Sequence, residues 1–376
     1  MSDMKYRKLK TLAKYPTGKL NSNAAVEDGK YPFFTCAHDI YRIDQYSYDG
    51  EYVLLGGNNA SGDFPIFYYN GKFDAYQRTY LIQPLSKDTD TKYLYYSIGL
   101  KLHQMKANAS GTATKFLTQP ILNNINIEYR DIEEQKRIAN ILSTYDNLIE
   151  NNNKRIKLLE QMAENLYKEW FVRFRFPGYE DVEFEEKKPR GWQVGTEDKK
   201  HFAPTIFRYD KLGTIGSFVR GKNITAAQMI EGNIPVISAG LKPSGYHNQA
   251  NVFGENLTIS ASGANAGYLQ YNLNDIWAAD CSYYQDNTTI WFVYNTLKYL
   301  QPVISNLQCG AAQPHVYPKN INRLYILIPT EELIHKYNDF VKPYYNEIKV
   351  LNQYNQLLTQ QRDMLLPRLM SGKLEV

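Results

Sequence analysis

Between residues 138 and 170, apolar residues recur in alternating steps of four and three, the spacing of a coiled-coil seam. Charged and amide residues fill the other faces of the helix that this spacing predicts. Asp131 is placed to cap that helix, and Glu133 and Glu134 add negative charge in its first turn. We therefore predict a long helix over residues 131–173, whose seam is Ile138, Leu142, Tyr145, Ile149, Asn152, Ile156, Leu159, Ala163, Leu166 and Trp170.

The same pattern returns 199 residues later, where it predicts a second long helix over residues 330–376. Tyr145 corresponds to Tyr344, and Leu159 corresponds to Leu358. The chain is thus a duplicated unit of globular segment plus long helix, and each helix is expected to bury its seam against its twin. The second seam is Val341, Tyr344, Ile348, Leu351, Asn355, Leu358, Arg362, Leu365 and Leu369.

Each seam contains one asparagine, Asn152 in the first and Asn355 in the second. If residues 138–170 pair antiparallel with residues 337–369, Asn152 lies opposite Asn355 at the centre of the helix pair. A buried polar pair there would define the register at some cost in stability. The alternative is that both asparagines lie on a solvated edge.

The two globular segments, residues 1–130 and 206–329, are predicted to mix α and β structure. Short apolar runs at residues 52–55 and 66–69 predict strands, and residues 92–105 predict a helix. A loop of small residues at 111–115 precedes a strand predicted over residues 122–127.

The second globular segment repeats landmarks of the first at an offset of 203 residues. Gly18-Lys19 corresponds to Gly221-Lys222, and residues 76–78 (Tyr-Gln-Arg) correspond to residues 279–281 (Ala-Asp-Cys). Between the repeats, residues 174–205 predict a charged linker with proline and glycine breaks. We therefore predict an α+β fold, in which two mixed α/β domains form an internal pseudo-twofold repeat separated by two long antiparallel coiled-coil helices.

Length and composition suggest a soluble, cytoplasmic protein of two domains. The chain has 376 residues and a net charge of +4, without an apolar run of membrane-spanning length or a signal-peptide pattern. Its three cysteines are scattered, which disfavours a disulfide framework or a cysteine zinc site. The mild positive charge is compatible with a nucleic-acid partner but does not require one.

Motifs in the helices resemble those of the specificity subunit of type I restriction–modification systems, and the resemblance covers essentially the whole chain. It is carried by residues 133–139 (Glu-Glu-Gln-Lys-Arg-Ile-Ala), 158–171, 174–178 (Phe-Arg-Phe-Pro-Gly) and 365–372. The second helix departs from the pattern, because it begins Glu331-Glu332-Leu333 instead of repeating Glu-Glu-Gln.

The resemblance implies a non-catalytic subunit with two target-recognition domains, each recognising half of a bipartite DNA sequence. It implies that the helix pair sets the spacer and docks two methyltransferase subunits, through which restriction subunits join. A helix of some 40 residues is about 60 Å long, and half-sites would lie roughly 34–36 Å apart, as in other twofold DNA-binding proteins. No cofactor is expected in this chain, since the methyl donor and ATP belong to the partners.

Polar residues of the glycine-rich and small-residue loops are the candidates for DNA contact, because they offer donors and acceptors to bases and phosphates. For any single one of them, an ordinary turn is the alternative. In the first segment they are Lys19, Asn58, Asn59, Ser61, Arg78, Thr114 and Lys115; in the second they are Arg220, Lys222, Asn223, Ser262, Asn265, Gln313 and His315.

Enzymatic motifs are incomplete in this chain. Residues 216–222 begin like a phosphate-binding loop, but Asn223 stands where serine or threonine is needed. An acidic cluster at Asp181 and Glu185, with Lys187, lies in the charged linker, no Asn-Pro-Pro-Tyr or Asp-Pro-Pro-Tyr motif occurs, and the histidines lack metal-ligand spacing. Two alternatives stay open: an assembly scaffold without DNA specificity, and the DNA-recognition part of a self-contained methyltransferase or nuclease.

Overall fold

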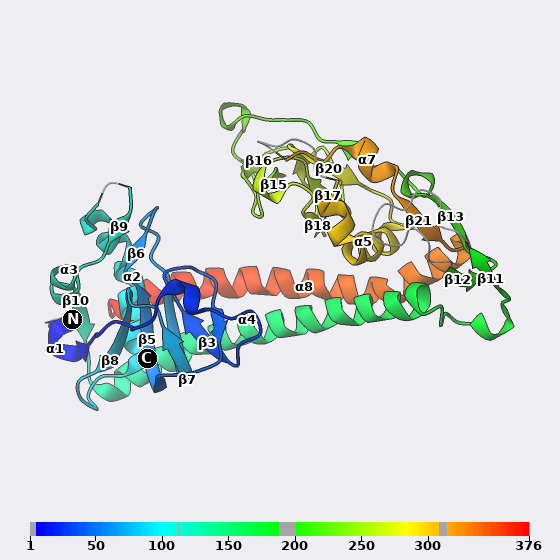
Figure 1. Ribbon diagram of the computed structural model, residues 1–376. Coiled ribbons are helices and arrows are strands. Elements are labelled where there is room, and N and C mark those ends of the chain that lie inside the picture. The colour runs from blue at the N-terminus through cyan, green and yellow to red at the C-terminus, as the bar shows by residue number, and fades with distance from the viewer. Residues whose placement is uncertain (1–4, 112, 188–200, 308–313, 376) are drawn as a thin grey trace. The chain divides into compact units, whose positions relative to one another are not determined.

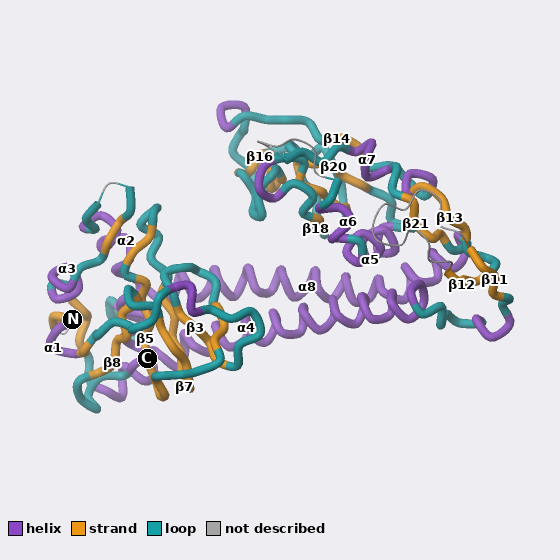
Figure 2. The backbone as a smooth tube through the Cα atoms, viewed as in Figure 1, coloured by secondary structure: helices purple, strands orange, loops and turns teal. Residues whose placement is uncertain are grey.

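The computed structural model describes residues 5–111, 113–187, 201–307 and 314–375 (Figure 1). It divides into two compact units, one of residues 1–151 and 354–376 and one of residues 152–353. Figure 2 shows that both units mix helices and strands and that long helices run through each of them. None of the helices in the described ranges combines the length and apolar character that a bilayer span requires.

The first unit is built on a six-stranded sheet in the order β2-β8-β5-β7-β3-β4. Two further pairs, β1 with β10 and β6 with β9, lie outside this sheet. The strands are β1 (Lys5–Lys8), β2 (Ala13–Lys14), β3 (Tyr31–Phe34), β4 (Tyr41–Ile43), β5 (Tyr48–Gly56), β6 (Asn58–Asn59), β7 (Ile66–Ala75), β8 (Thr79–Pro84), β9 (Lys115–Phe116) and β10 (Asn126–Tyr129). The helices are α1 (Leu9–Leu12), α2 (Thr91–Asn108), α3 (Gln119–Asn123) and the first part of α4 (Ile132–Tyr167).

The second unit has a four-stranded sheet, β14-β20-β17-β18, and a three-stranded sheet, β16-β15-β19. Strands β11 and β12 pair with each other, as do β13 and β21. The strands are β11 (Phe184–Lys187), β12 (His201–Pro204), β13 (Arg208–Lys211), β14 (Val219–Arg220), β15 (Ile234–Ile237), β16 (Gly245–His247), β17 (Asn256–Ser260), β18 (Leu269–Asn272), β19 (Trp277–Ala278), β20 (Cys281–Tyr284) and β21 (Tyr325–Ile328). The helices are α5 (Ile290–Tyr299), α6 (Gln301–Ser305), α7 (Pro318–Asn322) and most of α8 (Glu331–Met370).

Strand registers repeat between the units at the offsets found in the sequence. The pair Lys5–Tyr129 in β1 and β10 corresponds to Arg208–Ile328 in β13 and β21. Other pairs repeat at an offset of 203 on both strands: Gly56–Thr79 with Ile259–Ser282, and Phe34–Ala75 with Ile237–Ala278. The internal duplication is therefore a duplication of the fold.

One long strand of the first unit is divided in the second. Strand β7 pairs antiparallel with β5 at one end and parallel with β3 at the other, which joins all six strands. In the second unit these roles fall to two separate strands, β18 beside β17 and β19 beside β15. The second unit therefore has two sheets where the first unit has one, although equivalent strands keep equivalent pairing partners.

Helix α4 begins with the cap that the sequence predicts, and α8 begins with a similar one. Asp131 Oδ1 accepts a hydrogen bond from the Glu134 amide at 2.8 Å, and Thr330 Oγ1 accepts one from the Leu333 amide at 3.3 Å. All the predicted seam positions are buried or half-buried. Helix α4 ends at Tyr167 and continues as a π-helical turn over Lys168–Val172, whereas α8 ends at Met370.

Within each unit, the portions of α4 and α8 run antiparallel. In the first unit Asp146 pairs with Arg362 at 2.6 Å, and Arg130 reaches the end of α8. In the second, Arg155 pairs with Glu347, and Tyr337 donates to the Ala163 carbonyl at 2.9 Å. The predicted antiparallel coiled-coil arrangement is therefore present in both units.

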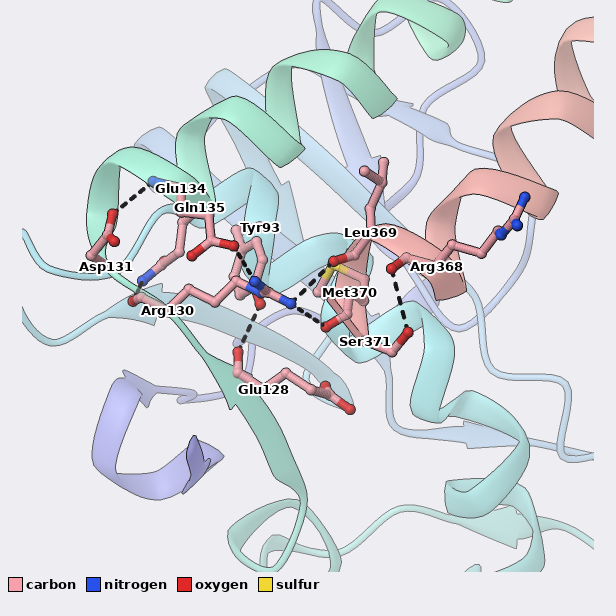
Figure 3. A network of polar contacts seen from close by, with 10 residues as sticks. All are labelled: Tyr93, Glu128, Arg130, Asp131, Glu134, Gln135, Arg368, Leu369, Met370 and Ser371. Atoms are coloured by element: carbon pink, nitrogen blue, oxygen red, sulfur yellow. Dashed lines mark hydrogen bonds and ion pairs between the residues drawn. The ribbon is translucent and has the colours of Figure 1, made fainter. Parts of the chain in front are cut away.

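Arg130 binds the carboxyl end of α8 (Figure 3). Its Nη2 lies 3.3 Å from the Leu369 carbonyl and 3.1 Å from that of Met370, and its Nη1 pairs with Glu134. Carbonyls at a helix C-terminus lack helical partners and carry partial negative charge, so a guanidinium there satisfies both needs.

Two predicted segments differ from the structure. Residues 122–125 are not strand, because α3 begins at Gln119 with Pro120 in its first turn, and strand β10 starts only at Asn126. The linker predicted over residues 174–205 contains the β11–β12 hairpin, and Phe176 within it is buried and stacks on Phe207 at 5.5 Å. Burial of these aromatic side chains gives the described residues of this stretch, 174–187 and 201–205, a packed structure that their charges alone did not suggest.

Candidate nucleic-acid interface

A tight turn at residues 76–79 joins β7 to β8 and presents Gln77 and Arg78, both exposed. The Thr79 amide donates to the Tyr76 carbonyl at 2.8 Å, which closes the turn. Other backbone hydrogen bonds of the turn cross to neighbouring segments, at 2.8–2.9 Å, from Tyr76 N to Phe34 O, from Gln77 N to Leu20 O and from Gly57 N to Arg78 O. The backbone is held from several sides while the two long side chains stay exposed.

Beside this turn, a short ribbon brings several candidate residues together. Strands β6 and β9 pair Asn58 with Phe116 and Asn59 with Lys115. Asn59 Oδ1 accepts hydrogen bonds from the Ser61 amide at 2.9 Å and from its hydroxyl at 2.7 Å. The candidates Asn58, Asn59, Ser61, Lys115 and the adjoining Thr114 therefore form one group in the first unit.

A pocket of about 520 Å³ lies between the turn and this ribbon. The Arg78 guanidinium lies 5.3 Å from the centre of the Phe116 ring, a cation–π distance. Gln77, Phe116 and Gln119 were not among the candidates, because nothing in their local sequence marks them. The pocket is lined by Thr17, Gly57, Gln77, Arg78, Tyr80, Ser110, Phe116, Leu117, Thr118 and Gln119.

In the second unit, two candidates bind one carboxylate and a third adjoins them. Asp280 accepts hydrogen bonds from Arg220 and from the Ser262 hydroxyl. Ser262 also forms a β-bridge with His315, whose ring stacks on Tyr317 with centroids 5.9 Å apart. Asp280 was missed as a site residue, since its partners lie 60 and 18 residues away.

Lys19 and Lys222 lie on segments that pack beside the turn of residues 76–79 and its equivalent at residues 279–281, because Gly18 N donates to Thr79 O at 3.0 Å and Lys222 N donates to Ala278 O at 2.9 Å. Lys19, Lys222 and Asn223 are exposed, and Asn265 is half-buried in a 3-10 turn. Gln313 lies outside the described residues. Asn152 and Asn355 are half-buried on α4 and α8, and their predicted pairing stays a prediction.

The signals of enzymatic chemistry have structural explanations. In the loop that resembles a phosphate-binding motif, a Cβ on Gly221 would lie 2.5 Å from the Ala279 carbonyl, so this glycine permits close backbone packing. In the acidic cluster, Lys187 pairs with Glu185 at 2.7 Å and donates to backbone carbonyls of Thr205 and Phe207. Among the described residues, no group of three or more His, Cys, Asp or Glu could hold a metal ion.

The fold and these polar loops define a class: a duplicated α+β protein whose two domains share a framework, differ at their exposed loops and each continue into a long helix. Comparison with known proteins agrees. The family model described as the type I restriction modification DNA specificity domain matches residues 1–161 and 209–360.

Individual relatives point the same way. The chain is 36% identical over 162 residues to the type I restriction enzyme EcoDI specificity subunit of Escherichia coli, an alignment of 43% of this chain and 35% of that protein. It is 28% identical over 305 residues to the MjaIX specificity subunit of Methanocaldococcus jannaschii, covering 76% of this chain and 69% of that one.

A solved structure shares the fold. The S subunit of a type I restriction–modification system from M. genitalium superposes with a TM-score of 0.60 at 20% identity, over 98% of this chain and 97% of that chain. This chain therefore belongs to the type I restriction–modification DNA specificity family, as a specificity subunit.

Proposed function

We propose that the chain is a non-catalytic subunit that directs partner methyltransferase and restriction subunits to a bipartite DNA target. Each domain recognises one half of that target. The observation that carries this proposal is a backbone framework that repeats while the exposed side chains at its turns differ. Strand registers agree at an offset of 203 residues, whereas Gln77 of the first domain corresponds to Asp280 of the second. Equal scaffolds with different exposed side chains suit two half-sites of different sequence.

The DNA contacts are proposed to come from the grouped loop residues of each domain. Arginine, lysine and hydroxyl groups suit phosphate oxygens, and arginine, asparagine and glutamine also suit base edges in the major groove. In the first domain these are Lys19, Asn58, Asn59, Ser61, Arg78, Thr114 and Lys115, and in the second they are Arg220, Lys222, Asn223, Ser262, Asn265, Gln313 and His315.

The long helices are proposed to set the spacer and to dock two methyltransferase subunits, through which restriction subunits join. Leu158 on α4 and Leu357 on α8 occupy the same repeat position and are 58% and 54% exposed. Each lies one helical turn from another exposed apolar side chain, Met162 beside Leu158 and Tyr354 beside Leu357. Contiguous exposed apolar side chains indicate a surface that a partner covers, and two equivalent positions suit two copies of one partner. Asn152 and Asn355 are proposed to define the helix register.

Mapping methylated adenines in the host genome tests the proposal. With the chain present, we expect a split motif with an unread gap of constant length, and with the gene deleted that motif should lose its methylation. A continuous motif, or methylation that is independent of this chain, would contradict the proposal. A scaffold without DNA specificity would in addition show no sequence preference for duplex DNA in filter binding at moderate salt.

A further inference from the structure

We propose that the turn of residues 76–79 determines the base preference of the first domain, with Arg78 recognising guanine and Gln77 recognising an adjacent adenine. This inference rests on the proposed function and deepens it, because it assigns base specificity to particular side chains.

The frame of this turn is the same in both domains. The strand pairs Phe34–Ala75 and Gly56–Thr79 enclose three residues, 76–78, and the equivalent pairs Ile237–Ala278 and Ile259–Ser282 enclose residues 279–281. In the first domain the amide after the parallel pair, that of Tyr76, donates to Phe34 O at 2.9 Å. In the second, the Ala279 amide donates to Ile237 O at 2.8 Å.

The side chains at the tip differ, and strand β20 starts one position earlier, at Cys281, than strand β8, which starts at Thr79. Residues 76–78 are Tyr-Gln-Arg and residues 279–281 are Ala-Asp-Cys, so an exposed arginine in one domain corresponds to the buried Cys281 in the other. The charge at the tip is consequently of opposite sign, and in the second domain Asp280 orients Arg220 instead. Similar backbone turns with different exposed side chains are the arrangement expected of a specificity determinant, since packing does not dictate the exposed residues Gln77 and Arg78.

The first tip has the chemistry of major-groove recognition. An arginine can donate two parallel hydrogen bonds to guanine O6 and N7, and a glutamine amide can both donate to and accept from adenine N7 and N6. The Phe116 ring beside the guanidinium limits its freedom, which lowers the entropy lost on binding. The Gln77 amide is oriented in turn by Asn21, whose Oδ1 accepts one of its hydrogens at 3.0 Å and leaves the other available.

The experiment compares adenine methylation in cells that express the wild-type chain, Arg78→Ala, Arg78→Lys or Gln77→Ala. For each variant, methylation is measured at motif sites and at sites that differ from the motif by one base pair. We expect Arg78→Ala to reduce discrimination at one G·C pair of one half-site by about 5- to 150-fold. Arg78→Lys should also lose discrimination, because lysine keeps the charge but cannot donate the two parallel hydrogen bonds of a planar guanidinium. Gln77→Ala should reduce discrimination at an adjacent A·T pair.

Two matched variants complete the design. Arg220→Ala should relax the other half-site only, and Lys10→Ala, an exposed lysine on α1, should change neither half. Should a variant abolish methylation, binding of the purified full-length chain to target duplexes and their single-base variants provides the same comparison.

The outcomes distinguish failure of the proposed function from failure of this inference. If the wild-type chain yields no split motif, the proposed function fails and the assignment of Arg78 and Gln77 fails with it. If the wild-type motif is split but Arg78→Ala retains both halves unchanged, the assignment alone is overturned. It is also overturned if the variant weakens binding equally on all sequences and lowers its salt dependence, because Arg78 would then contact only phosphate.

Discussion

Gly18 and Gly221 occupy positions where a side chain would collide with the backbone of a neighbouring segment. A Cβ on Gly18 would lie 2.2 Å from the Ala75 carbonyl, and one on Gly221 would lie 2.5 Å from the Ala279 carbonyl. In both domains the glycine thus allows the segment that contains it to pack directly beside the turn, at residues 76–79 in the first domain and at residues 279–281 in the second. The repeated glycine-lysine landmark in the sequence therefore reflects a packing requirement.

Because of buried tyrosines, the stability of both units should change with pH in the alkaline range. Burial raises the pKa of Tyr93 and of Tyr284 from 10.0 to about 12. The unfolded chain therefore releases protons between pH 10 and pH 12 that the folded chain retains. Stability should be fully present below pH 10 and should fall as the pH rises toward 12.

Tyrosinate absorbance measured beside far-ultraviolet circular dichroism checks this prediction. We expect Tyr93 and Tyr284 to ionise only as the dichroism signal is lost, so that part of the tyrosinate absorbance develops together with unfolding. A single titration of all tyrosines near pH 10 in a folded chain would show the prediction to be wrong.

At the scale of elements, the end of α8 depends on one side chain from outside the helix. Replacing Arg130 by alanine removes hydrogen bonds to the Leu369 and Met370 carbonyls and the ion pair with Glu134. Hydrogen bonds to charged groups contribute about 1.5–3 kcal/mol. We expect Arg130→Ala to lower the free energy of unfolding of the first unit by about 2 kcal/mol, measured by urea denaturation.

Arg137→Ala is the matched control, because Arg137 is an exposed arginine on the same helix α4. Its effect should stay within about 0.5 kcal/mol. Equal losses in the two variants would mean that the helix end does not require its guanidinium.

Some elements could be predicted from sequence patterns and others could not. The caps at Asp131 and Thr330 and the two heptad seams were predictable, because the atoms involved lie within a few residues of one another. The division of β7 into β18 and β19 was not, since the interruption depends on which distant strands are available for pairing. Likewise, the hairpin of β11 and β12 forms beside aromatic burial at Phe176, which a count of charges does not reveal.

At the scale of the whole molecule, the duplication predicts two equivalent docking sites for partners. Under the proposed function, Leu158→Glu and Leu357→Glu should each weaken the binding of one methyltransferase subunit by about tenfold or more, since each buries a charge in an apolar contact. Native mass spectrometry of the assembled complex should show one partner lost in each variant and both lost in the double variant.

Gln161→Glu provides the control, because it adds the same charge at an exposed polar position of α4. It should leave two partners bound, and all the variants should keep the wild-type melting temperature because the altered side chains are exposed. Unchanged stoichiometry in the double variant would remove these leucines from the docking surface.

The sequence by itself determined that this chain is a repeat of mixed domain plus long helix, with the seams, caps and offsets that relate its two halves. These features depend on spacings of a few residues or on similarity between the two halves of the sequence, so they can be predicted without knowing which distant residues are in contact. Only the tertiary structure decided that Gln77 and Arg78 share a pocket with Phe116, and that Asp280 gathers Arg220 and Ser262. Such groups join segments far apart in the chain, and their proximity follows from strand pairing that side-chain patterns do not specify.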